Sequence, residues 1–446
     1  MPTFAFHTYG CQMNVRESEA AARALLDAGH TEAADEASAD IVIVNTCSVR
    51  GKAEDKAIGK LGLLCASKRE RPARIIGLMG CMAQRMGKDI FKKLPLLDFS
   101  IGTRCADSVA PAVEAALQGR TTLAMKPLDA QPDAPSGHVC NGNFAAFVTI
   151  LLGCNRRCSY CIVPDVRGDE WSRPAREILK EVRQLAENGI KEVTLLGQSI
   201  MNYGLRTQAF DELDPPSPGG YTLPFPRLLE AVAAIDGIER IRFTSGHPSG
   251  VTEELIRLYR EEPKLCHHLH LPVQSGSTEV LSRMRRGYTR ERYLEAVKKL
   301  RQAVPDIAIT TDVIVGFPGE TEADFEATRS LMAEASFDNA FIFKYSPRPG
   351  TVSATWEDDV CDAEKARRNQ LLLSDQDIRG TQLNQRLIGT TVEVLAEGPS
   401  LRNKANWSGR TSSNKIVIFS PPKALQPGER IQLTITKAAP QTLYAE

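Results

Sequence analysis

Three cysteines are crowded into one short segment of the chain. Cys154, Cys158 and Cys161 have the spacing C-x3-C-x2-C and directly follow the apolar run from Phe147 to Leu152. Three thiolates in one turn indicate a metal centre. A tight loop after a strand suits an iron–sulfur cluster, because the N–H groups of the loop can hydrogen-bond the cluster sulfides. Three ligands bind only three irons of a cubane, so the fourth iron is free to chelate another ligand.

Two other uses of these thiols remain open at this point. A disulfide would leave one of the three cysteines over, and a zinc knuckle usually opens with C-x2-C and closes with a second pair of Cys or His, which does not follow nearby. The spacing resembles that of the radical S-adenosylmethionine (SAM) enzymes. In those enzymes the amino acid end of SAM is the ligand of the fourth iron.

The length and composition indicate a protein with several domains. The chain has 446 residues, 42% of them hydrophobic and 25% charged, and 55 basic residues balance 55 acidic ones. One hydrophobic core rarely supports such a length, so we expect two or three domains. We find no apolar run of about eighteen residues and no secretory leader, so we expect a cytoplasmic protein without a membrane partner. The eleven cysteines are then reduced, which favours metal ligands over disulfides.

The first part of the chain, residues 1–120, alternates between strand and helix patterns. This rhythm predicts a Rossmann-like α/β domain with a parallel sheet. The expected strands are Thr3–Tyr9, Ile41–Asn45, Arg74–Met79 and Asp98–Gly102, and the expected helices are Asn14–Ala28, Lys52–Ser67, Ala83–Lys93 and Asp107–Leu117.

One cysteine follows each of the first three expected strands. These are Cys11, Cys47 and Cys81, and two of them stand beside a glycine. The carboxyl ends of parallel strands meet at one edge of a sheet, so the three thiols should meet in space and could hold a second cluster. Small apolar cysteines that merely fill strand ends are the alternative. The other five cysteines fit no ligand pattern.

Residues 121–143 have the Pro-rich, aperiodic character of a linker, and a second run of strands and helices occupies residues 144–375. Six β/α units there predict a partial TIM-type (β/α)6 barrel whose active site lies in the loops at the carboxyl ends of the strands. The expected strands are Ala146–Leu152, Glu192–Leu196, Arg240–Thr244, His268–Leu271, Ile307–Val315 and Asn339–Tyr345. From their places on this rim, the expected cofactor-binding residues are Gln198, Ser245, Gln274, Ser275, Asp312, Gly316 and Pro318.

Residues 380–446 change to short alternating runs, which predict a small β-barrel or sandwich. The expected strands are Thr390–Ala396, Lys415–Ile418 and Arg430–Thr436. Basic and aromatic side chains are interleaved here as in single-stranded nucleic-acid binders, although a solvated barrel face is the alternative. The basic residues expected to contact RNA are Arg402, Lys404, Arg410 and Lys415, together with Arg285 and Arg286 of a second cluster that could instead be a solvated helix end.

Taken together, the order of the three domains resembles that of the methylthiotransferases. The matching segments are Thr8–Asn14, Asn45–Arg50, Leu269–Ser277, Met284–Arg290 and Gly409–Thr411 with Asn414 and Lys415. The last of these resembles the RNA-binding TRAM domain of that family. Two segments depart from the usual family pattern, Pro164–Gly168 after the cysteine loop and Ser199–Tyr203 after Gln198.

The resemblance implies two [4Fe–4S] clusters. Cys154, Cys158 and Cys161 would hold the cluster that binds and cleaves SAM, and are in that sense catalytic, while Cys11, Cys47 and Cys81 would hold an auxiliary cluster. The implied reaction adds a methylthio group to C2 of an N6-isopentenyladenosine beside the anticodon of tRNA. The implied partners are the anticodon stem-loop and an electron donor such as a flavodoxin or ferredoxin, and we expect a monomer.

Two alternative functions remain at this stage. A related methylthiotransferase would act on threonylcarbamoyladenosine in tRNA or on an aspartate of a ribosomal protein. A protein of another class, a non-enzymatic RNA-binding iron–sulfur sensor, would carry the same cysteines without turning over SAM.

Overall fold

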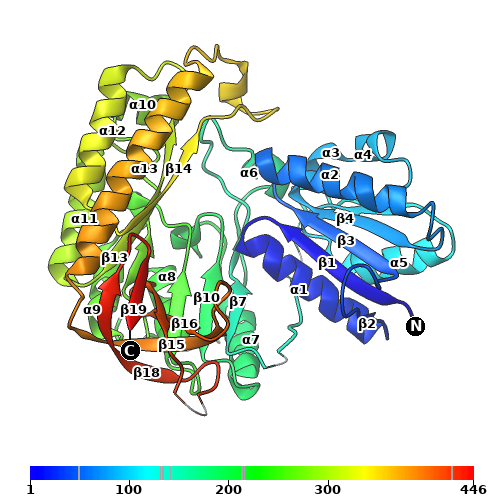
Figure 1. Ribbon diagram of the computed structural model, residues 1–446, viewed down its shortest axis with the longest axis horizontal. Helices are drawn as coiled ribbons and strands as arrows, with labels where there is room; N and C mark the ends of the chain where they lie inside the picture. The colour runs from blue at the N-terminus through cyan, green and yellow to red at the C-terminus, as the bar shows by residue number, and fades with distance from the viewer. Residues whose placement is uncertain are drawn as a thin grey trace.

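The computed structural model describes residues 1–48, 51–130, 132, 135–140, 142–211, 214, 216–422 and 425–445, with the backbone alone for residues 51–53. The protein has three parts, an N-terminal sheet, a central partial barrel and a small C-terminal barrel, in that order along the chain (Figure 1). Val49 and Arg50, which belong to one of the expected motifs, lie outside the described residues, as do linker residues 131, 133, 134 and 141. No helix in the described ranges is both long and apolar enough to cross a membrane.

The N-terminal part is a six-stranded parallel sheet in the order β2-β1-β3-β4-β5-β6. Its strands are β1 (Thr3–Tyr9), β2 (Thr31–Glu32), β3 (Ile41–Thr46), β4 (Ile75–Gly80), β5 (Phe99–Ile101) and β6 (Thr122–Ala124). Every residue of β3 and β4 is buried, because helices cover both faces of the sheet. This confirms the predicted parallel α/β domain. The stretch expected to be a linker, however, begins with β6, the edge strand that pairs with β5.

Two groups of helices cover this sheet, one on each face (Figure 1). One face packs against α2 (Gly51–Ser67), α3 (Cys81–Met86) and α4 (Asp89–Lys93). The other packs against α1 (Gln12–Asp27) and α5 (Val109–Leu117), which follows the short helix η1 (Ala106–Ser108). Both α1 and α3 start where a strand has just ended, so the N-termini of these helices lie at the carboxyl edge of the sheet.

The central part has six parallel strands in two adjoining sheets, β11-β10-β7 and β12-β13-β14. An isolated bridge between Ile241 and Leu265 links the two sheets, so the strands follow one another as in a partial barrel. The strands are β7 (Ala145–Thr149), β10 (Glu192–Leu196), β11 (Arg240–Phe243), β12 (His268–His270), β13 (Ala308–Val315) and β14 (Asn339–Lys344), with a short ribbon of β8 (Leu151–Leu152) and β9 (Trp171–Ser172). The predicted (β/α)6 arrangement is confirmed.

One or two helices lie between successive parallel strands of this part. The helices of this part are α6 (Val163–Arg167), α7 (Ala175–Glu187), α8 (Pro224–Ala233), α9 (Glu253–Glu261), α10 (Thr278–Arg283), α11 (Arg290–Ala303), α12 (Glu322–Ala335) and α13 (Asp362–Gln385), with one-turn helices η2 (Ile200–Asn202), η3 (Pro248–Gly250) and η4 (Val352–Thr355). Helix α13 was not expected from the sequence. It runs beside α12 toward the C-terminal part (Figure 1).

The C-terminal part is a closed five-stranded barrel in the order β15-β16-β17-β19-β18. Its strands are β15 (Thr391–Pro399), β16 (Trp407–Thr411), β17 (Ile416–Phe419), β18 (Arg430–Ala438) and β19 (Thr442–Ala445), of which β16 and β19 were missed in the sequence. The barrel is fastened to the central part by Arg242 of β11, which donates to the carbonyl oxygens of Thr411 and Ser412 at 2.8 and 3.1 Å. Arg240, the first residue of β11, donates to the carbonyl of Arg410 at 2.8 Å, and the N–H of His267, just before β12, donates to Oγ of Ser412 at 3.0 Å. The barrel therefore lies at the amino ends of these strands, away from the cysteine loop.

Candidate active site

The cysteine loop of the central part is held by its own backbone. Gly153, which precedes Cys154, has φ +76°, and a Cβ there would lie 2.1 Å from the carbonyl oxygen of Asp169. Only glycine fits this turn without strain. The N–H of Gly153 donates to Oε1 of Gln198 at 2.7 Å, and the N–H of Cys154 donates to the carbonyl of Gly168 at 3.0 Å. These contacts fix the loop between β8 and the loop after β10.

The three thiols of this loop lie close enough for their charges to act on one another. Burial, with a contribution from the charge of Cys158, raises the pKa of Cys154 to about 11 and that of Cys161 to about 12. Sγ of Cys158 accepts a hydrogen bond from Nη1 of Arg286 at 3.4 Å. A buried group of thiols with raised pKa values becomes fully ionised only when a metal or a positive charge compensates it. This donor set fits an iron–sulfur cluster with thiolate ligands.

A second group of thiols meets at the carboxyl edge of the N-terminal sheet. Cys11 caps α1 after β1, Cys47 follows β3, and Cys81 begins α3 after β4. The Cys47 thiol hydrogen-bonds both neighbours, which lowers the pKa of Cys11 to about 6, lowers that of Cys81 and raises its own. The structure therefore brings together the three cysteines that the strand pattern expects to meet.

Buried asparagines brace this second group, and the sequence analysis did not single them out as functional. Asn14 donates from Nδ2 to Oδ1 of Asn45 at 3.0 Å, and Asn45 returns a bond to the Asn14 carbonyl at 2.8 Å. Oδ1 of Asn14 also accepts from the N–H of Cys11 at 3.2 Å. A signal was present, because each asparagine stands within three residues of a strand-end cysteine.

The geometry distinguishes a cluster from a single ion. Within the part of the chain that the structure describes, no three side chains of Cys, His, Asp or Glu close around a point where one metal ion could sit. A cubane makes a different demand, since each thiolate binds its own iron. All eleven cysteines lie in described ranges and form no disulfide bond. The zinc and disulfide alternatives therefore find no support, and two sets of three thiols fit two cubanes.

The expected cofactor-binding residues lie on the rim around the first trio, but their environments differ. Gln198 contacts the cysteine loop directly. Ser245 and Gln274 have φ values of +65° and +72°, as expected of residues at tight turns beside a site. Ser275 is fully buried and hydrogen-bonds Thr328 of α12, so it holds its loop against that helix.

The remaining rim residues lie at β13 and its following loop. Asp312 pairs with Nε2 of His270 at 3.3 Å and is partly exposed. Gly316 donates its N–H to the carboxylate of Glu320, and it precedes Phe317 and Pro318. The Phe317 ring packs edge-on against Tyr160 of the cysteine loop, with centroids 6.3 Å apart. The loop that contains Gly316 and Pro318 therefore does reach the cysteine loop.

The residues expected to contact RNA fall into two sets. Arg285, Arg402 and Lys404 are exposed. Arg286 is instead buried at 8% exposure beside Cys158, so it offers no phosphate-binding surface. The sequence shows a run of arginines but not which of them turns inward.

Arg410 and Lys415 are also engaged within the chain. Nζ of Lys415 donates to Asp338 at 2.8 Å and to Asn384 at 2.9 Å, across the junction between the barrel and the central part. Nε of Arg410 donates to Glu397 at 2.9 Å. The Lys415 contacts therefore help to hold the barrel on the central part, whereas the Arg410 contact joins two strands within the barrel.

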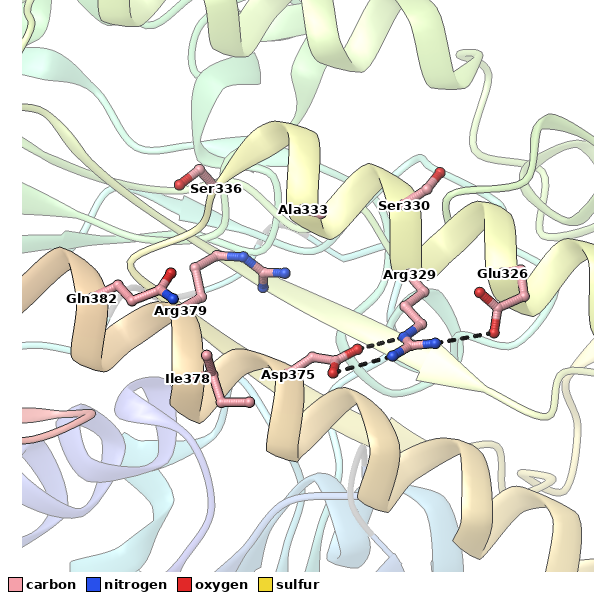
Figure 2. A pocket seen from close by; sticks show the side chains of 9 residues that line it. All are labelled: Glu326, Arg329, Ser330, Ala333, Ser336, Asp375, Ile378, Arg379 and Gln382. Atoms are coloured by element: carbon pink, nitrogen blue, oxygen red, sulfur yellow. Dashed lines mark hydrogen bonds and ion pairs between the residues drawn. The ribbon is translucent and has the colours of Figure 1, made fainter.

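A separate groove of about 510 Å³ lies between α12 and α13 (Figure 2). Arg329 crosses it and pairs with Asp375 at 2.6 Å and with Glu326 at 3.5 Å. The groove includes none of the residues expected from the sequence to bind a cofactor or RNA. The cysteine trios, not this groove, therefore define the candidate active site.

Three family models match the chain in succession. The model of the Radical SAM superfamily matches residues 148–332, that of the Uncharacterized protein family UPF0004 matches residues 3–102, and that of the TRAM domain matches residues 385–446. Among solved structures, the radical S-adenosylmethionine methyltransferase TsrM from Kitasatospora setae is similar, with a TM-score of 0.56 and 14% identity over 79% of this chain and 77% of that chain. At that identity the likeness shows a shared fold alone.

Relatives match along the full length. The tRNA-2-methylthio-N(6)-dimethylallyladenosine synthase of Akkermansia muciniphila is 44% identical over 462 residues, which cover 100% of this chain and 98% of the relative. The synthase of the same name from Methylacidiphilum infernorum is 42% identical over 449 residues, covering 100% of this chain and 94% of the relative. These matches confirm the resemblance seen in the sequence: the chain belongs to the radical SAM methylthiotransferase family.

Proposed function

We propose that this protein adds a methylthio group to C2 of N6-isopentenyladenosine next to the anticodon of tRNA. The observation that carries the proposal is the presence of two separate trios of thiols, one on each of two adjoining parts of the fold. Full-length relatives named as tRNA-2-methylthio-N(6)-dimethylallyladenosine synthases support the choice of substrate. A single trio would suffice for SAM cleavage alone, so the second trio supports sulfur insertion.

In this proposal Cys154, Cys158 and Cys161 hold the SAM-binding [4Fe–4S] cluster, and Cys11, Cys47 and Cys81 hold the auxiliary one. When bound, the first cluster would supply the electron that cleaves SAM, SAM would supply the radical that removes hydrogen from C2, and the auxiliary cluster would supply the inserted sulfur. An aromatic C–H has no acidity that a side-chain base could exploit, so the chain contributes binding, orientation and exclusion of water.

Several residues of the rim carry out that positioning. Gln198 fixes the start of the cysteine loop, and Arg286 stabilises the Cys158 thiolate by donating to its sulfur. Arg156, inside the loop, donates to Ser249 at 2.9 Å and to Asn202 at 3.3 Å, which ties the loop to two neighbouring rim segments. One of these segments, Ser199–Tyr203, departs from the family pattern, and its Ser199 and Asn202 side chains accept hydrogen bonds from Arg156.

We further propose that Arg285, Arg402 and Lys404 contact the tRNA backbone, since they are exposed and basic. A flavodoxin or ferredoxin would supply electrons. We propose a monomer that works in the cytoplasm, where tRNA is modified.

The experiment that names the modified base is mass spectrometry of tRNA nucleosides from cells that lack this protein. The expected result is loss of 2-methylthio-N6-isopentenyladenosine together with accumulation of N6-isopentenyladenosine. Loss of a methylthiolated threonylcarbamoyladenosine would instead identify the related activity. An unchanged nucleoside profile would favour a ribosomal-protein substrate or the non-enzymatic sensor.

Two alanine variants separate the roles of the trios in the reconstituted protein. Cys154→Ala should abolish release of 5′-deoxyadenosine from SAM. Cys47→Ala should leave SAM cleavage measurable and stop methylthiolation. Methylthiolated product from the Cys47 variant would refute the auxiliary role.

A further inference from the structure

Arg167 is a buried arginine of the central part that reaches into the N-terminal part. It is the last residue of α6, the helix that starts two residues after Cys161. Its Nη1 and Nη2 donate to the two carboxylate oxygens of Glu17 on α1, at 2.8 and 3.2 Å. The two side chains are only 4% and 6% exposed. A buried bidentate ion pair therefore joins the central part to the N-terminal part.

The same short helix packs directly on the second trio of thiols. Cys81 forms a small buried cluster with Ile162 and Val166. The hydroxyl of Thr103 donates to the carbonyl of Val166 at 2.6 Å, which fastens the helix to the N-terminal part. Helix α6 is thus anchored beside Cys161 at its start and beside Cys81 along its length, so it spans the space between the two trios.

The charges around the second trio agree with this placement. Burial alone would lower the pKa of Arg167, but the negative charges of Cys81, Glu17 and Cys11 raise it well above its ordinary value. Arg167 and Glu17 carry opposite charges and both lie within electrostatic reach of the sulfurs of Cys11 and Cys81. The arginine and the glutamate therefore act on the same sulfurs with opposite sign.

We propose that Arg167 is a positioning residue through which the radical SAM domain supplies the counter-charge of the auxiliary cluster, with Glu17 holding the guanidinium in place. The inference rests on the proposed function, because it requires a cluster on Cys11, Cys47 and Cys81. A thiolate-bound cubane is negatively charged, and nearby positive charge favours its reduced form and raises its reduction potential. The auxiliary cluster thereby attains its working potential only when the two domains are docked.

The test uses the full-length protein with Cys154, Cys158 and Cys161 all changed to alanine, so that the auxiliary cluster alone remains. Into this parent we introduce Arg167→Met, Arg167→Lys and Glu17→Gln, and as matched control Arg176→Met, whose side chain is 60% exposed. Iron and sulfide per chain and the reduction potential, followed by electron paramagnetic resonance, are measured after anaerobic reconstitution.

Arg167→Met should shift the potential to more negative values, Arg167→Lys should restore part of the shift, and Glu17→Gln should move the potential in the positive direction. The Arg176 control should match the parent. Parent-like potentials in Arg167→Met at full cluster loading would overturn the inference. Should that variant fail to fold, Glu17→Gln decides, and an unchanged potential there overturns it equally. A parent protein that takes up no cluster would refute the proposed function itself, and the inference with it.

Discussion

Nη1 of Arg286 donates a hydrogen bond to Sγ of Cys158 over 3.4 Å, in a pocket where Arg286 also donates to the hydroxyl of Tyr288 at 3.0 Å and to the carbonyl of Pro272 at 3.2 Å. Burial alone would lower the pKa of Arg286, but the surrounding tyrosines and Cys158 raise it well above its ordinary value. The arginine is therefore charged and fixed against one sulfur of the trio that we propose holds the SAM-binding cluster.

Replacement of Arg286 by methionine should lower the reduction potential of the SAM-binding cluster and slow 5′-deoxyadenosine release by about 10-fold or more, the scale of one lost charged hydrogen bond. Lysine should not restore the rate, because it cannot make the three planar contacts. The measurements are a redox titration and the rate of SAM cleavage. Arg285→Met is the matched control, since Arg285 is exposed, and equal potentials in the two variants would contradict the assignment.

His138 connects α1 and α7 and should make their contact depend on pH. Its Nδ1 lies 3.1 Å from Glu19 and its Nε2 lies 2.6 Å from Glu181. Two carboxylate acceptors require both ring nitrogens to be protonated. Burial by itself would lower the pKa of His138, but the hydrogen bonds to Glu181 and Glu19 raise it above the ordinary 6.5.

The imidazolium therefore contributes stability that is fully present below about pH 6.5 and is lost as pH rises through the raised pKa. We expect His138→Gln to lower the free energy of unfolding by about 1–2 kcal/mol at pH 6, and by less at pH 9. Urea denaturation at both pH values measures this difference. A difference that stays constant with pH would show that His138 is neutral in the folded protein.

Arg242 should be required to keep the C-terminal barrel docked. It is 8% exposed, and besides the two carbonyl bonds of Thr411 and Ser412 it pairs with Glu192 at 3.0 Å. Arg242→Met leaves Glu192 buried without its partner, at a cost of about 3–5 kcal/mol. The barrel should then unfold in a separate early transition. The exposed Arg430, paired with Glu239, is the control, and its replacement should cost at most about 1 kcal/mol.

The exposed basic residues should differ from the docked ones in tRNA binding. Replacing Arg402 and Lys404 by alanine should weaken binding and reduce the slope of log affinity against log salt by up to about 1.4, since each contact to a single strand contributes about 0.7. Lys415→Ala should chiefly lower the stability of the barrel junction. Filter binding at several salt concentrations, with calorimetry of the free proteins, separates these outcomes. An unchanged salt slope in the double variant would exclude contact with phosphate.

Much of the architecture was predictable because hydrophobic periodicity and strand-end cysteines are local signals. Buried runs such as Ile41–Thr46 mark the parallel strands, and topology then brings the cysteines after them to one edge.

Helix α13 was not predicted from the sequence, and the reason is physical. Besides Leu372 it buries Lys365, Arg368, Gln376 and Asn384, so it has no apolar stripe. Polar contacts, such as those of Gln376 with the Phe337 carbonyl and of Arg368 with Glu320, help to hold it.

The part of the site that could not be predicted depends on contacts between domains. Arg167 and Glu17 are 150 residues apart in sequence and meet only because α6 docks against α1. Arg286 belongs to a run of arginines whose inward and outward members look alike until the turn after α10 is known. In both cases the sequence shows the charge, and only tertiary packing decides where it lies: Arg167 beside Glu17, and Arg286 against the sulfur of Cys158.

The hydrogen bonds from Arg242 to the carbonyls of Thr411 and Ser412 also limit which ligands can contact both the barrel and the cysteine loop. The barrel is attached where the central strands begin, whereas the cysteine loop lies where they end. A five-residue strand such as β10 spans about 17 Å. A ligand that contacts the barrel and the cysteine loop at once must be at least that long, and stiff enough to hold one nucleotide at the cysteine loop. An extended RNA hairpin meets that requirement, and a free nucleoside does not.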